Sequence, residues 1–205
     1  MLLRNGFILT MLALLWANCQ QVPQIETVEI TTPEGYIERY ERRLSDYAKE
    51  GVYQKIDPEG TLVEEATYRA DTLHGQRILY YENKDTQVVE SYRMGVFEGA
   101  YRVYYPGGRI KLAGQYAANE MTGLWRGFYE NGTLKEEVTF EHNQENGTFT
   151  EYHANGQLKA QGTYLDGDNE HGQLKLYDET GRHYRTMSCE KGICQTIWDA
   201  TKTVN

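Results

Sequence analysis

The chain has 205 residues, of which 40% are hydrophobic, 12% are aromatic and only four are proline, a composition that excludes disorder throughout. It carries 21 Lys and Arg against 30 Asp and Glu, and its formal net charge at pH 7 is -9. This charge opposes binding to a phosphate backbone or to an anionic membrane surface, so nucleic acid is not expected as a partner.

The first 18 residues have the pattern of a signal peptide. Arg4 precedes an apolar run from Phe7 to Ala17, which is shorter than a bilayer span and fits the central region of a signal peptide. Cys19 closes this segment, which resembles the lipobox of bacterial lipoproteins, although Asn18 departs from the usual small residue. The resemblance implies that Cys19 is acylated and that the protein is exported to the cell envelope, with the outer membrane as the expected site. A plain cleaved signal and a retained apolar tail are the alternatives.

Two short segments follow the cysteine. Residues 19–35 carry Pro23 and no recurring aromatic position, and are predicted to be a flexible tether. Residues 36–50 are predicted to be an N-terminal cap or a half repeat. The spacing of Ile37, Tyr40 and Leu44 suits a helix, whereas the likeness of residues 33–35 to residues 58–60 suits strands. The strand interpretation is favoured, and the helix stays open.

From residue 51 to residue 188 glycine recurs at a fixed period. The leading glycines are Gly51, Gly75, Gly99, Gly123, Gly147 and Gly172, separated by 24, 24, 24, 24 and 25 residues. Nine positions after each of them, a second column reads Gly60, Lys84, Gly108, Gly132, Gly156 and Gly181. We interpret both columns as turns. A period of this length predicts a repeat architecture.

Between the glycines two aromatic columns recur. Five residues after each leading glycine stand Ile56, Tyr80, Tyr104, Phe128, Tyr152 and Tyr177, and seventeen residues after it stand Tyr68, Tyr92, Tyr116, Phe140, Tyr164 and Cys189. Segments such as residues 157–164 alternate polar and apolar side chains, as half-buried strands do. The sequence therefore predicts an all-β fold, an elongated antiparallel β-meander of about five 24-residue hairpin repeats.

Segments such as residues 128–137 (FYENGTLKEE) and 152–162 (YHANGQLKAQG) carry this pattern most clearly. They resemble the MORN repeat, and more closely the MORN-repeat variant of bacterial YwqK-type proteins, over about residues 51–189. The resemblance implies a scaffold with no catalytic motif to transfer. Because YwqK-type proteins are labelled as antitoxins of toxin–antitoxin pairs, it also implies an alternative, an antitoxin-like protein that neutralises a partner toxin.

Residues 189–205 are predicted to be a C-terminal cap. Once residues 1–18 are removed and Cys19 is acylated, only Cys189 and Cys194 remain as free cysteines. An even pair in an exported protein favours a disulfide, with two free thiols as the alternative.

The sequence offers few candidates for chemistry. It shows no pairing of a nucleophile with a base and no cluster of metal-ligand residues at metal-binding spacing, so we expect a protein that is not an enzyme and that has no catalytic residues, metal or cofactor. The acidic turn at residues 166–171 has the oxygen ligands that calcium prefers, but it matches no calcium-loop signature and is interpreted as a solvated turn.

A second aromatic set is the candidate binding surface. Tyr81, Tyr105 and Tyr129 directly follow a column residue and are expected on the opposite face of the sheet, where Tyr101 and Trp125 can complete a strip. Shared sheet packing is the alternative. The expected function is that of an envelope-anchored scaffold that presents an extended β-surface to a protein or glycan partner.

Overall fold

The computed structural model describes residues 24–202. They form one antiparallel sheet of sixteen strands and a short 3₁₀ helix, η1 (Ala200–Lys202). The strands are β1 (Ile25–Thr31), β2 (Ile37–Arg43), β3 (Lys49–Ile56), β4 (Leu62–Arg69), β5 (Thr72–Tyr80), β6 (Thr86–Arg93), β7 (Val96–Phe97), β8 (Gly99–Tyr104), β9 (Ile110–Ala117), β10 (Glu120–Phe128), β11 (Leu134–Glu141), β12 (Gln144–Tyr152), β13 (Leu158–Tyr164), β14 (Gly172–Tyr177), β15 (His183–Glu190) and β16 (Ile193–Asp199).

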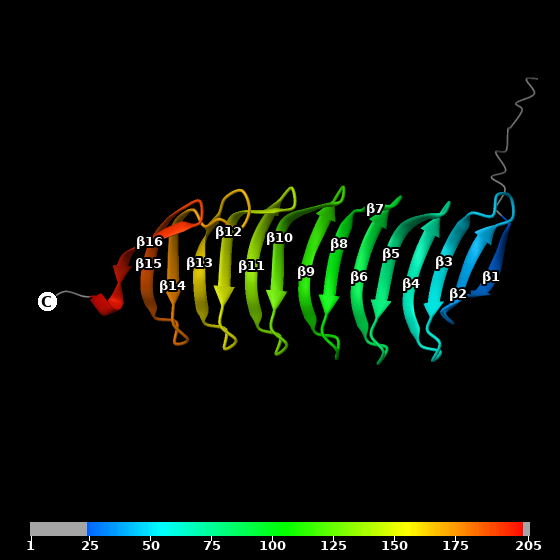
Figure 1. Ribbon diagram of the computed structural model, residues 1–205, viewed down its shortest axis with the longest axis horizontal. Coiled ribbons are helices and arrows are strands. Elements are labelled where there is room, and N and C mark those ends of the chain that lie inside the picture. Colours follow the sequence, from blue (N-terminus) through cyan, green and yellow to red (C-terminus); the bar gives the residue numbers. More distant parts are fainter. Residues whose placement is uncertain (1–23, 203–205) are drawn as a thin grey trace, which may run out of the picture.

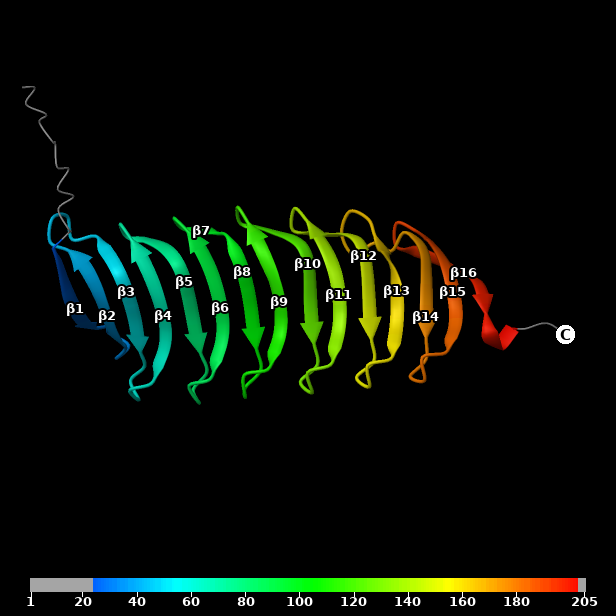
Figure 2. The same cartoon turned by 180° about the vertical axis from the view of Figure 1, so that it is seen from behind.

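The strands lie along the sheet in sequence order, and each pairs with the strands before and after it. The one departure is the two-residue β7, which pairs with β6 just before β8 continues the row. Figures 1 and 2 show this row from its two sides, and no helix of residues 24–202 covers either side. The predicted all-β meander is therefore confirmed. Within residues 24–202 no helix is long and apolar enough to cross a membrane.

The N-terminal segment is more regular than predicted. Residues 25–31 form β1, which pairs with β2 along its whole length, so the prediction of a tether through residue 35 was wrong from residue 25 onward. Residues 37–43 are strand rather than helix, and β3 already begins at Lys49. Leu44 lies just after β2 and is exposed. The cross-strand ion pairs Arg39–Glu29 and Arg42–Glu26 join β1 to β2, a pairing that sequence periodicity alone did not reveal. The predicted signal peptide and Cys19 lie outside the described residues.

The leading glycines are not turn residues, which corrects their interpretation from the sequence. Each lies inside the first strand of its unit, with a φ between 67° and 113°. The register of the preceding pairing shifts close by, as between Ala66 and Tyr68 in the β4–β5 pair. A residue with positive φ favours glycine, which has no β-carbon, in a β-bulge as in a turn. A bulge glycine and a turn glycine therefore look alike in a sequence. The second column does lie in turns, including Lys84 with a φ of 70°.

In five of the other hairpins two residues with positive φ join the strands, whereas the connections after β2 and β13 are longer. The five pairs are Ala70-Asp71, Met94-Gly95, Ala118-Asn119, His142-Asn143 and Lys191-Gly192. Positive φ at both central residues defines the type I′ turn, whose twist matches that of paired strands. Only two of these pairs contain glycine, so the sequence did not mark them as tips.

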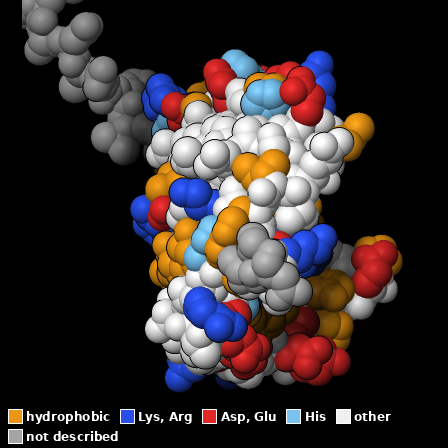
Figure 3. All heavy atoms as spheres, turned by 90° about the vertical axis from the view of Figure 1, so that its left-hand side faces the viewer, with side chains coloured by type: hydrophobic (Ala, Val, Ile, Leu, Met, Phe, Trp, Pro, Cys, Tyr) orange, Lys and Arg blue, Asp and Glu red, His pale blue; other side chains and the backbone are white. Residues whose placement is uncertain are grey.

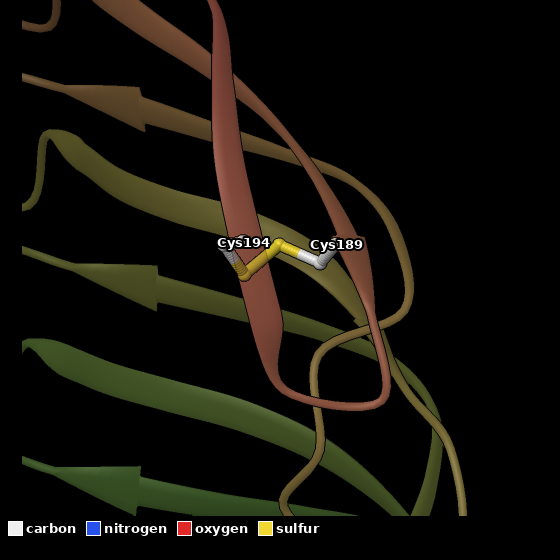
Figure 4. The surroundings of a disulfide bond; sticks show 2 residues. All are labelled: Cys189 and Cys194. Atoms are coloured by element: carbon white, nitrogen blue, oxygen red, sulfur yellow. A yellow bond between two sulfur atoms is a disulfide. The ribbon is translucent and has the colours of Figure 1, made fainter.

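The sheet ends in a covalently closed hairpin. Cys189 on β15 faces Cys194 on β16, and a disulfide joins them (Figure 4). The preceding hairpins hold non-covalent pairs at the same place, such as Tyr68 with Leu73 and Tyr116 with Met121. The disulfide therefore replaces an apolar cross-strand contact at the open end of the stack, where no further strand supports the hairpin.

Candidate functional site

One row of side chains crosses the sheet from β3 to β15, and we call it the spine. Its members stand two and fifteen residues after the leading glycines and pair across each hairpin: Tyr53–Ala66, Arg77–Glu90, Tyr101–Gly114, Trp125–Val138, Phe149–Gly162 and Leu174–Met187. Most of the buried residues of the chain lie in this row. Successive side chains of a strand point to opposite faces, so the spine defines one face of the sheet, the spine face.

Ring contacts extend the spine through the middle of the sheet. Tyr116 packs edge-on against Trp125, with ring centroids 5.3 Å apart, and Trp125 lies 5.8 Å from Phe140. Tyr101 also contacts Trp125, which is only 3% exposed. Tyr101 and Trp125 are therefore packing residues of the spine, and the packing alternative holds for these two members of the predicted aromatic strip.

A polar cluster interrupts the spine at its second unit. Arg77 donates to Glu64 at 2.7 Å and to Glu90 at 3.1 Å, and the Tyr92 hydroxyl donates to Glu90 at 3.0 Å. Glu90 is only 8% exposed. Burial and the neighbouring Glu90 carboxylate raise the pKa of Tyr92 to about 12. Arg77 pairs with both carboxylates and Tyr92 adds a hydrogen bond to Glu90, so each charged group of the cluster has a partner within the fold.

The remaining members of the predicted strip lie in hairpin turns and fasten neighbouring units. The hydroxyl of Tyr81 donates to the backbone carbonyl of Tyr104 at 2.7 Å. Tyr105 and Tyr129 make the equivalent bonds one and two units later, to the carbonyls of Phe128 and Tyr152. The five candidate residues thus form no common strip, because three belong to the turns and two to the spine.

The opposite rim of the sheet is fastened in the same way. At each two-residue tip, the second residue donates its N–H to a backbone carbonyl of the previous unit, as Asn119 does to Phe97 and Asn143 to Met121. Side-chain oxygens add to this, since Asn143 Oδ1 accepts the N–H of Met121 at 2.7 Å. Because hydrogen bonds join neighbouring units along both rims of the sheet, the units are held in register and the sheet is a stiff scaffold.

Two hollows open on the spine face in the C-terminal half. The first, of about 210 Å³, lies over β9 to β12 and is mostly apolar, with Leu112, Met121, Trp125, Gly127, Glu136, Val138, Phe140 and Glu145 around it. Glu145 lies at its rim. Burial raises the pKa of the Glu145 carboxyl, and the carboxylates of Asp168 and Glu136 raise it further.

The second hollow, of about 220 Å³, lies one unit further along the sheet. The stacked rings of Phe149 and Tyr164, 4.1 Å apart, form part of its wall, and its other lining residues are Glu151, His153, Lys159, Ala160, Glu170, Leu174, Leu176, Tyr177 and Tyr184. Lys159 pairs with Glu151 at 2.7 Å. Seen from the C-terminal end, the molecule is hollowed on one side, where hydrophobic and acidic side chains lie together (Figure 3).

Three segments match the MORN repeat variant. They are residues 49–70, 121–142 and 145–166, and each begins two residues before a leading glycine. Each matched segment thus contains one β-hairpin, which starts shortly before the bulge glycine and ends at the connection to the next hairpin. Residues 73–94 and 97–118 lie outside the matched segments but form the same two-strand unit. A comparison with curated proteins found no match.

The acidic turn at residues 166–171 is held by its own backbone and by the neighbouring repeat. Gly167 donates its N–H to the Glu145 carbonyl, and Leu165 donates to the carbonyl of Asn169. In the part of the chain that the structure describes, no three His, Cys, Asp or Glu side chains are grouped to hold a metal ion.

Sequence reasoning missed the carboxylates of the hollows. The column two residues before each leading glycine reads Lys49, Leu73, Phe97, Met121, Glu145 and Glu170. It therefore changes from basic through apolar to acidic along the chain. This change of residue type along the column was the sequence signal that could have identified Glu145 and Glu170. It can be interpreted only once the structure places the column beside the spine.

Proposed function

We propose that the chain is a non-enzymatic repeat scaffold, anchored in the cell envelope, that binds a partner protein through the spine face. The observation that carries the proposal is the pair of open hollows on this face, where the partly exposed rings of Phe140 and Tyr164 lie beside carboxylates. The rims, by contrast, use their polar groups to join the units. A single-layer sheet with both rims fastened offers a stiff surface, and a stiff surface loses little conformational entropy on binding.

The proposed anchor is the acylated thiol of Cys19. β1 begins at Ile25, six positions after Cys19, and six residues of fully extended chain reach at most about 20 Å. The anchor would therefore hold the first repeat close to the membrane surface, with the hollows in the distal half of the sheet.

Intact mass spectrometry of the protein from the membrane fraction of its native host tests the anchor. We expect the mass of residues 19–205 plus acyl chains, less two hydrogens for the Cys189–Cys194 disulfide. An unprocessed and reduced chain in the soluble fraction would contradict both the anchor and the oxidising compartment.

Affinity capture from gently solubilised envelope tests the binding role. The tagged full chain should retain a specific protein that the tag alone does not retain. Capture of no specific protein, under conditions that preserve weak complexes, would count against a scaffold of this kind. A captured protein that is toxic when expressed without this chain would identify the antitoxin form of the same binding function.

A further inference from the structure

The two hollows are equivalent sites in successive repeats. Trp125 and Phe149 occupy the same spine position one unit apart, as do Phe140 and Tyr164 in the adjoining aromatic column. Each hollow thus has an aromatic wall from the same two positions of the repeat. A ligand that fits the first hollow can repeat its contacts in the second.

The hollows also share a carboxylate that has no cationic partner. Glu145 and Glu170 stand at the same position in successive repeats, and within residues 24–202 neither forms an ion pair, whereas Glu64 and Glu90 share Arg77. Neighbouring carboxylates crowd Glu145, whose pKa is raised as described above. An incoming cation would relieve this repulsion.

The distance between the hollows sets the spacing of the ligand. One repeat spans two strands, and neighbouring strands lie about 4.8 Å apart, so equivalent points are separated by roughly 10 Å. A peptide in the extended polyproline II conformation advances about 3.1 Å per residue with three residues per turn, so three of its residues cover roughly this distance and return the side chain to the same face. Side chains at positions i and i+3 of such a peptide would reach equivalent points of the two hollows.

We propose that the two hollows bind an extended basic segment of a partner protein, in which Lys or Arg residues three positions apart reach Glu145 and Glu170 while intervening apolar side chains pack on the aromatic walls. This inference rests on the proposed function and specifies the chemistry of its partner. The net charge of -9 of the whole chain would steer a basic segment toward this face.

The test uses two fluorescein-labelled synthetic peptides of the same composition, made of Lys, Leu and Thr. One has Lys at every third position, and the other has the same number of Lys at every second position within one half. Fluorescence anisotropy at about 0.15 M salt measures their affinity for the full chain in detergent. The peptide with three-residue spacing should bind at least about 10-fold more tightly, because only its cations can reach both carboxylates.

Matched charge variants assign the binding to the hollows. Glu145→Gln with Glu170→Gln removes two negative charges from the hollows, while Glu59→Gln with Glu130→Gln removes two from exposed turns. The first pair should weaken binding about 10-fold to 100-fold, and the second less than about 2-fold. Circular dichroism should show the same β-signal for both variants, since neither pair replaces a spine residue.

Three results would overturn the inference. They are equal affinity for the two peptides, an equal loss in the two charge variants, and binding of neutral oligosaccharides in place of the basic peptide. Envelope capture separates this failure from that of the scaffold itself. If the Glu145→Gln, Glu170→Gln chain retains the captured protein at the wild-type level, the partner binds elsewhere and the scaffold stands. If the wild-type chain captures nothing, the proposed function fails first.

Discussion

The indole of Trp125 on β10 lies directly over Gly114 on β9, so closely that a β-carbon at residue 114 would overlap the ring. Phe149, one repeat after Trp125, covers Gly162 on β13, with its ring 2.8 Å from an added β-carbon. In both places a glycine leaves space for a large ring on the neighbouring strand. This pairing lets a single-layer sheet bury an aromatic side chain without a second layer above it.

Gly114→Ala should therefore destabilise the fold by about 1–3 kcal/mol, because the added methyl group forces the indole out of its position. Urea denaturation monitored by Trp fluorescence and circular dichroism measures the loss. The control is a double-mutant cycle with Trp125→Leu, in which the same alanine should cost much less. Equal costs in both backgrounds would show that the contact with Trp125 is not the cause.

Tyr105→Phe should lower stability by about 1 kcal/mol, since it removes one hydrogen bond between neighbouring repeats and leaves the Phe128 carbonyl without this donor. Tyr104→Phe is the matched control, because the Tyr104 hydroxyl has no hydrogen bond within the described residues. Thermal unfolding compares the two. If Tyr105→Phe leaves stability intact but abolishes capture of the envelope partner, Tyr105 is a binding residue, as the sequence interpretation held.

Arg77→Leu should destabilise the protein by about 2 kcal/mol at pH 7, because it leaves the Glu64 and Glu90 carboxylates unpaired and largely shielded from water. Adding Glu64→Gln and Glu90→Gln should restore most of the stability at pH 7. A triple variant as unstable as Arg77→Leu would contradict this explanation.

The pKa of Asp199 is lowered to about 2, chiefly by the Thr201 hydroxyl and backbone N–H that donate to it, with Arg185 adding to the effect. A lowered folded-state pKa contributes stability above the unfolded value near 3.8, and that contribution is lost as the pH falls toward 2. NMR titration of the Asp199 carboxyl carbon should give a midpoint near this value. A midpoint near 4 would show that the C-terminal hydrogen bonds do not persist in solution.

The sequence predicted the meander well because a 24-residue period with two turns per unit favours consecutive antiparallel hairpins. It could not separate a bulge glycine such as Gly75 from a turn glycine such as Gly60, since both positions require positive φ. It also did not predict β1, although the turn that follows it contains Gly35, because β1 has no leading glycine or aromatic column and is held by pairing with β2 and by the ion pairs of Glu26 and Glu29.

For the candidate site, the sequence correctly indicated aromatic residues, but it did not identify the spine face as the surface that carries them. Tyr105 and Tyr129 are recognisable as aromatic residues outside the columns, yet their hydroxyls are used between repeats. Which residues remain accessible depends on cross-strand register, which brings Glu145 opposite Phe140, a pairing that the spacing from the leading glycines does not by itself reveal. The hollows are a property of the assembled sheet, and single positions do not reveal them.

Site-specific photo-crosslinking in the native host tests the central claim most directly, that the spine face binds the partner. A benzophenone amino acid would replace Phe140, which lines the first hollow, and in a second strain Leu124, which is 38% exposed on the opposite face. The account predicts a covalent adduct of one additional protein from position 140 and none from position 124. An adduct from position 124 alone, or equal adducts from both, would contradict it.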